Sequence, residues 1–154
     1  MINTICLGII TLSFIFTPLS SIYGYFEIST NISIICDNNY TNCDKNIKNK
    51  ILNLLEECFL DSYEMPAYGV AIDSEIRENK QCGVWIEFDF SHTMVHNDMP
   101  FDKLLMEITP EMYGVNIIRY HNNMYEGRCY HINLSKNMNK IYDFIINKKV
   151  NLES

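Results

Sequence analysis

The feature that most constrains the fold is a strict alternation of side chains over residues 85–90, Trp-Ile-Glu-Phe-Asp-Phe. Successive side chains of an extended chain point to opposite faces, so Ile86, Phe88 and Phe90 share one face. Two acidic residues lie on the other face, beside Trp85. We therefore expect a β-strand with one face in a core and the other toward solvent, and the rest of the chain must cover the apolar face.

A strong helix signal precedes this strand. Asp44 is suited to cap a helix, and apolar side chains recur at helical spacing over residues 47–59. A fully buried large apolar side chain contributes about 1.5 to 3 kcal/mol, so this stripe must dock on another element. A second helix is predicted over residues 66–79, with Pro66 in its first turn. A strand over residues 68–76 is the alternative.

Short runs of β-branched, aromatic and apolar residues predict further strands. They lie at residues 25–28, 32–36, 92–96, 104–108, 115–120 and 129–134. The pair at 104–108 and 115–120 reads as a hairpin, with a short helix over residues 102–108 as the alternative. Ser135 is suited to cap a final helix with apolar residues on one side. The sequence thus predicts an α+β fold, an antiparallel sheet packed against two or three helices.

The chain has 154 residues, enough for one domain with extensions. Residues 1–24 contain no charged side chain, and an apolar run ends near Ser21 and Gly24. We expect a cleaved secretory leader here, with an uncleaved anchor or a buried apolar segment as the alternatives. The expected division is a leader over residues 1–24, a domain over residues 25–120 and a C-terminal strand and helix over residues 121–154.

Composition narrows the classes of partner. The chain is 47% hydrophobic, which supports a packed core, and its formal net charge is −7. An acidic chain has no positive field to attract phosphate backbones or anionic lipids. Nucleic acid is therefore not an expected partner, and no membrane contact is expected beyond the leader.

The cysteines and asparagines bear on the compartment. Cys36 and Cys43 are close in sequence and form a candidate disulfide in an oxidising compartment, whereas in the cytosol they would be small buried apolar residues. In a secreted chain, the triplets that begin at Asn31, Asn39 and Asn133 are candidate glycosylation sites.

No motif in the sequence indicates catalysis. His92 and His96 are four residues apart, but no further metal-ligand pattern stands beside them. His121 has no positioned nucleophile near it in sequence, and phosphate-binding loops are absent from the sequence. Glu87 and Asp89 are interpreted as the solvated side of a strand. An enzyme is therefore the least favoured class, and no cofactor or metal is expected.

Three segments in the centre of the chain resemble, in their order and pattern, segments of one known family. An Ile-Asp-Ser-Glu-Ile segment at residues 72–76 stands shortly before Trp85. Residues 90–96, Phe-Ser-His-Thr-Met-Val-His, resemble a crossover strand that contains Val-Thr-His, and residues 113–120 resemble a last strand in which Gly precedes aliphatic residues. In these motifs and their order, residues 32–120 resemble the small dynein light chains of the eight-kilodalton class.

The resemblance implies a non-catalytic function. Such proteins form homodimers by strand exchange and bind an extended partner peptide as an added sheet strand. Carried onto this sequence, Met94, Val95 and His96 would border the peptide groove and Phe90 would lie at its floor. A dynein-associated protein would be cytoplasmic. The alternative is a secreted, disulfide-containing α+β domain that binds a host or extracellular protein, which the leader and the cysteines favour.

Overall fold

The computed structural model describes residues 22–59, 64–66, 83–108, 115–132 and 138–152. The described helices are α1 (Tyr23–Ile28), α2 (Lys45–Phe59) and α4 (Met138–Leu152). The described strands are β1 (Asn31–Cys36), β2 (Asn39–Asn42), β3 (Glu64–Pro66), β4 (Val84–His96), β5 (Met99–Glu107), β6 (Val115–His121) and β7 (Met124–Ile132).

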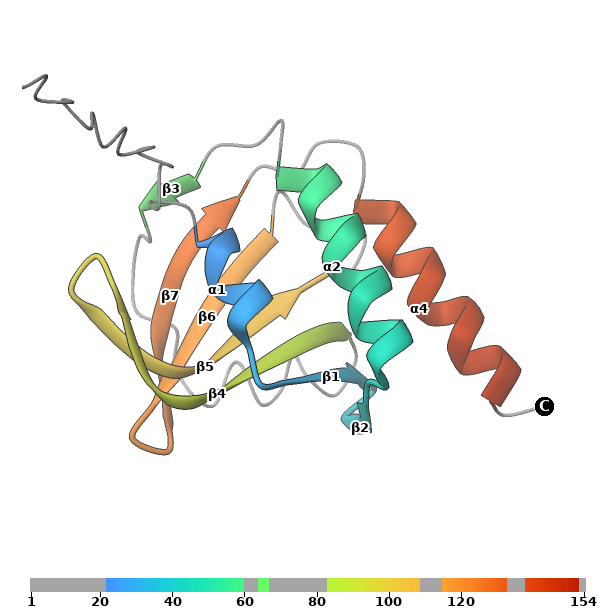
Figure 1. The fold of residues 1–154 in the computed structure, drawn as a ribbon, viewed down its shortest axis with the longest axis horizontal. Coiled ribbons are helices and arrows are strands. Elements are labelled where there is room, and N and C mark those ends of the chain that lie inside the picture. Colours follow the sequence, from blue (N-terminus) through green and yellow to red (C-terminus); the bar gives the residue numbers. More distant parts are fainter. Residues whose placement is uncertain (1–21, 60–63, 67–82, 109–114, 133–137, 153–154) are drawn as a thin grey trace, which may run out of the picture.

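The strands form one sheet in the order β2-β1-β4-β5-β6-β7-β3, and every pair is antiparallel. The three helices lie on the same side of this curved sheet, with α4 next to α2 (Figure 1). The α+β class with an antiparallel sheet is therefore confirmed. The strands predicted over residues 32–36, 104–108 and 115–120 are also confirmed, and the helical alternative over residues 102–108 is wrong.

The main core lies between the helices and the sheet. It includes Ile51 and Leu55 of α2, Ile141 and Ile145 of α4, and the side chains of β4 that the alternation placed on this face. In α1, the ring of Phe26 stacks on Phe88 of β4 with centroids 4.4 Å apart. Asp44 caps α2 as predicted, because its carboxylate accepts the backbone N–H groups of Asn46 and Ile47, both at 2.8 Å.

The opposite face of the sheet holds a second apolar cluster of Ile35, Trp85, Leu105 and Ile118, each at most 4% exposed. Beside it, Glu87 is only 7% exposed, and Lys103 of β5 lies 3.4 Å from its carboxylate. The interpretation as a solvated side is therefore wrong for Glu87, whereas Asp89 is partly exposed. It failed because the pairing of β4 with β5 brings Lys103 opposite Asp89, and that ammonium group stabilises both carboxylates.

The turns of three hairpins have the same backbone geometry. The two central residues have positive φ at Asp37 and Asn38, at Asn97 and Asp98, and at Asn122 and Asn123. Two residues with positive φ form the type I′ turn that matches strand twist, and Asn and Asp tolerate that conformation. Because β4 and β6 run in the same direction, the last two hairpins lie at the same end of the sheet.

The N-terminal part differs from the prediction. Residues 25–28, predicted to be extended, belong to α1, whose aromatic residues pack on the sheet instead of pairing with it. Ile22 is fully buried in the main core. A cut after Ser21 would leave α1 whole, whereas a cut after Gly24 would remove Ile22 from the core. Residues 1–21 and the helix predicted over residues 66–79, apart from its first residue, lie outside the described residues.

The C-terminal part is integral to the fold. The boundary predicted at residue 120 falls inside β6, and β7 pairs with β6 along its length. Helix α4 supplies Ile141 and Ile145 to the same core as α2. Within the described residues, the sheet and the main core therefore continue across the expected boundary at residue 120. Of the helices that the structure describes, none has the length and apolar character that a bilayer span requires.

Candidate functional site

Strand β4 has two halves with different neighbours. Its inner half pairs with β1 from Val84 to Asp89, and the pair of Asn31 with Asp89 is the last one. The outer half, residues 90–96, has no pair with β1, and its residues Met94, Val95 and His96 pair with β5. No described strand lies along its other edge. Among the described strands, the outer half of β4 therefore has a neighbour on one side only, and we call its other side the β4 edge.

A bulge separates the two halves. Between Asp89 and Met94 the strand β4 advances five positions, while its partner β5 advances only two, from Lys103 to Phe101. The extra residues Ser91, His92 and Thr93 are exposed. A bulge bends a strand and increases its twist, and the β4–β5 hairpin curls toward the helix side of the sheet (Figure 1).

The hairpin register determines which backbone groups face the β4 edge. His96 pairs with Met99 across the two-residue turn, and Val95 pairs with Pro100. Residues that flank such a turn exchange both hydrogen bonds, and the next pair points its N–H and C=O groups outward. The amide and carbonyl of Val95 therefore face away from β5. Proline fits opposite Val95, because that position donates no hydrogen bond to β4.

The four residues predicted to contact a partner all lie on this hairpin. The side chain of Val95 is 56% exposed, which is unusual for a valine in a strand. Phe90 packs edge-on against Phe101 with centroids 5.4 Å apart, and Met94 packs on the main core. His96 is 5% exposed. Val95 alone of the four thus offers a largely exposed apolar side chain, while the other three anchor the hairpin.

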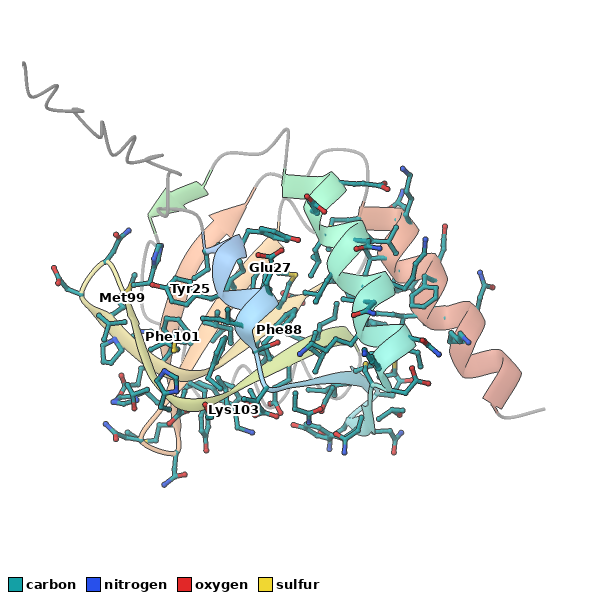
Figure 2. The ribbon with its side chains drawn as sticks, in the orientation of Figure 1. Tyr25, Glu27, Phe88, Met99, Phe101 and Lys103 are labelled. Atoms are coloured by element: carbon teal, nitrogen blue, oxygen red, sulfur yellow. The ribbon has the colours of Figure 1, made fainter. Side chains whose placement is uncertain are left out.

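Tyr25 of α1 also reaches this edge, and sequence reasoning missed it. Its hydroxyl donates a hydrogen bond of 2.7 Å to the carbonyl oxygen of Val95. Its ring packs edge-on against His96 at 5.1 Å and against Phe101 at 5.3 Å. Figure 2 shows Tyr25 directed from α1 toward the β4–β5 hairpin. The contact joins residues 70 positions apart, so no local pattern indicated it.

The other end of the β4 edge is also tied to the N-terminal segment. Both the backbone N–H and the hydroxyl of Thr30 donate to the carbonyl oxygen of Asp89, at 2.8 and 3.0 Å. Two edge carbonyls, those of Asp89 and Val95, are therefore satisfied by the segment around α1. The carbonyl oxygen of Val95 accepts a side-chain hydroxyl, whereas that of Asp89 accepts a backbone N–H as well as a hydroxyl.

Three charged side chains lie close together where the inner half of β4 meets the outer half. The ammonium group of Lys103 lies 2.8 Å from Asp89 and 3.4 Å from Glu87. Burial alone lowers the pKa of Lys103, but its hydrogen bond to Asp89 and the negative charge of Glu87 raise that pKa overall. This ion pair fixes the register of β4 on β5 at the start of the bulge.

A polar cluster joins the two hairpins at this end of the sheet. The guanidinium group of Arg119 donates to Glu126 at 2.9 Å and to the carbonyl of Pro100 at 3.3 Å. The ring of His121 lies 3.9 Å from the carboxylate of Asp102. These are structural ties between β5, β6 and β7. Within the described ranges, no group of three His, Cys, Asp or Glu residues is placed to hold a metal ion.

The predicted disulfide between Cys36 and Cys43 is wrong. Cys36 pairs with Asn39 beside the turn, whereas the amide of Cys43 bonds to Ile32 at the far end of β1. Four strand positions of about 3.3 Å each separate Ile32 from Cys36, so the two cysteines are about 13 Å apart along the hairpin. A disulfide requires Cα atoms within about 7 Å.

The candidate glycosylation sites differ in exposure. Asn39 and Thr41 lie on the edge strand β2 and are exposed. Asn31 lies on β1 between two strands, and the hydroxyl of Ser33 in its triplet is buried and bonded to Asn42 at 2.8 Å. Asn133 lies outside the described residues. Only the Asn39 triplet is open to solvent among those described.

No family model, no curated protein and no solved structure matches this chain. The resemblance to the small dynein light chains therefore rests on the sequence motifs alone and stays a prediction.

Proposed function

We propose that this chain is a non-catalytic protein-binding module whose ligand is an extended peptide segment that pairs with the β4 edge. The observation that carries the proposal is the continuation of β4 for seven residues beyond its last pair with β1. An incoming strand would find the outward amide of Val95 as a donor and the exposed Val95 side chain as an apolar contact.

The sequence of the outer half supports an accepting edge. Proteins protect an edge against pairing with lysine, proline or a bulge. Residues 90–96 contain no lysine or proline, and the bulge lies before Met94, so it leaves the part of the strand around Val95 regular. The bulge confines regular pairing to the part of the strand near the turn, around Val95. The net charge of −7 favours a peptide that is positively charged outside the apolar residue that meets Val95.

The test uses peptides selected from a random dodecamer display library on the full chain, with the most enriched sequence synthesised with a fluorescent label. Val95→Pro removes the outward amide, whereas Val95→Ala removes most of the side chain and keeps that amide. Loss of the backbone hydrogen bond should weaken binding by about tenfold in Val95→Pro relative to Val95→Ala. Equal binding by the two variants would rule out strand addition at this edge.

A second version of the test leaves the protein unchanged. Peptides with a single N-methyl group are compared position by position, because N-methylation removes one backbone donor. Pairing with the edge predicts that binding falls at every second position only, since alternate amides face the protein. If the chain instead forms a dimer through this edge, sedimentation will show the dimer dissociating in Val95→Pro, and the peptide proposal will be replaced by self-association.

We also propose the secreted alternative as a second candidate, on one observation. The Asn39 triplet is exposed on an edge strand, where a glycan would meet no packed surface. Expression of the full chain in a secreting eukaryotic cell should give a protein whose mass falls on glycosidase treatment, and Asn39→Gln should reduce that fall by the mass of one glycan. An intracellular protein without glycan would count against this candidate.

A further inference from the structure

We propose that the Tyr25 hydroxyl is a built-in competitor at the β4 edge, one that an incoming peptide must displace from the carbonyl oxygen of Val95. The inference rests on the proposed function and assigns a regulatory residue to that site. Its basis is the 2.7 Å hydrogen bond from Tyr25 to the one edge carbonyl that lies in the regular part of the outer strand.

The geometry makes this contact a replaceable one. A strand that pairs at Val95 accepts a hydrogen bond from its amide and donates one to its carbonyl. The carbonyl accepts the hydroxyl group of Tyr25, and this hydrogen bond is exposed to solvent. A tilt of the Tyr25 side chain about its own torsion angles moves the phenol oxygen away from the edge without any change in the backbone of α1. Binding therefore exchanges one hydrogen bond for another at this atom.

The ring of Tyr25 makes contacts that do not involve its hydroxyl group. It packs edge-on against His96 and Phe101, and the neighbouring Phe26 anchors α1 on Phe88. Replacing the hydroxyl by hydrogen thus removes the competing donor and keeps the ring contacts. Tyr25→Phe is therefore a clean test of competition, whereas Tyr25→Ala would also remove the packing of the hairpin.

Helix α1 offers a matched control. Tyr23, two residues earlier, donates its hydroxyl to the carbonyl of Leu52 in α2 at 3.3 Å, away from the β4 edge. Tyr23→Phe makes the same chemical change on the same helix. It should alter stability slightly and leave peptide affinity unchanged.

The experiment measures the labelled dodecamer binding to the full chain, to Tyr25→Phe and to Tyr23→Phe, with a further library selection on Tyr25→Phe. We expect Tyr25→Phe to bind about two- to tenfold more tightly than the unmodified chain, which corresponds to the removal of one competing hydrogen bond. Tyr23→Phe should bind with unchanged affinity.

The outcomes separate the two proposals. If Val95→Pro loses binding but Tyr25→Phe binds no more tightly than the unmodified chain, the competitor role is wrong and the peptide site stands. If Tyr25→Phe binds more weakly, the hydroxyl contacts the peptide, and the inference is also overturned. If neither the unmodified chain nor Tyr25→Phe yields a peptide that is sensitive to Val95→Pro, both proposals fail.

Discussion

The two halves of β4 belong to one continuous strand but have different surroundings. In the inner half, residues 84–88 are all buried, with β1 and β5 on either side. In the outer half, Val95 is 56% exposed and only β5 is a strand neighbour within the described part of the chain. The difference teaches that one strand can supply both the centre of a core and a surface for another chain, with a bulge at the transition.

The largest effect should come from the inner half. Phe88 is fully buried and stacks on Phe26, so Phe88→Ala should lower the free energy of unfolding by about 3 to 5 kcal/mol. Val95→Ala should change it by less than about 0.5 kcal/mol, because the side chain is largely exposed. Urea unfolding followed by tryptophan fluorescence measures both. Similar losses in the two variants would remove the distinction between the halves.

An intermediate effect on the free energy of unfolding is expected where the two halves of β4 meet, beside Lys103. Lys103→Met removes the ammonium group that lies 3.4 Å from the carboxylate of Glu87, a residue that is 7% exposed. Because Lys103 itself is partly exposed, the expected loss is about 1 to 2 kcal/mol in the free energy of unfolding. Lys140→Met is the matched control, since the pair of Lys140 with Glu57 is exposed on both sides and should contribute below about 0.5 kcal/mol. Equal losses would show that burial at the junction is unimportant.

The smallest effect concerns the attachment of α1 to the inner part of the fold. Burial raises the pKa of Tyr23 from 10.0 to about 12, with Glu27 and Glu56 adding to the shift. A raised pKa means that the folded state keeps the proton more tightly, so the stabilisation is complete below pH 10 and is lost as the pH rises toward 12. In an ultraviolet titration, Tyr23→Phe should have one late-ionising tyrosine fewer than the unmodified chain. An unchanged titration in that variant would contradict the assignment.

The periodic parts of the fold were predictable from the sequence. Helix α2, with Asp44 as its cap, follows from the helical spacing of its apolar residues. The paired strands β5 and β6 follow from their continuous apolar runs, in which the consecutive residues Leu104 and Leu105 are both fully buried. Residues 25–28 were wrongly predicted to be extended, because a run of four residues is too short to show a period. Their helix is stabilised by the stacking of Phe26 on Phe88, a contact 62 positions away in sequence.

The site was predictable only in part. Residues 90–96 were singled out by a family resemblance, and in the described part of the chain Val95 has only β5 as a strand neighbour. The contact of Tyr25 and the cation beside Glu87 both depend on long-range pairing that no local pattern carries. The error at Cys36 and Cys43 was avoidable, because a two-residue turn at Asp37 and Asn38 already places Cys36 opposite Asn39.

Amide hydrogen exchange at Val95, followed by nuclear magnetic resonance, tests the open edge most directly. In the chain alone, the Val95 amide should exchange much faster than the amides of Met94 and His96, whose positions pair with β5. Saturation with the selected dodecamer should slow the Val95 amide to the rate of its neighbours. A Val95 amide that is already protected in the chain alone, or that the bound peptide leaves unchanged, would contradict an edge that accepts a strand.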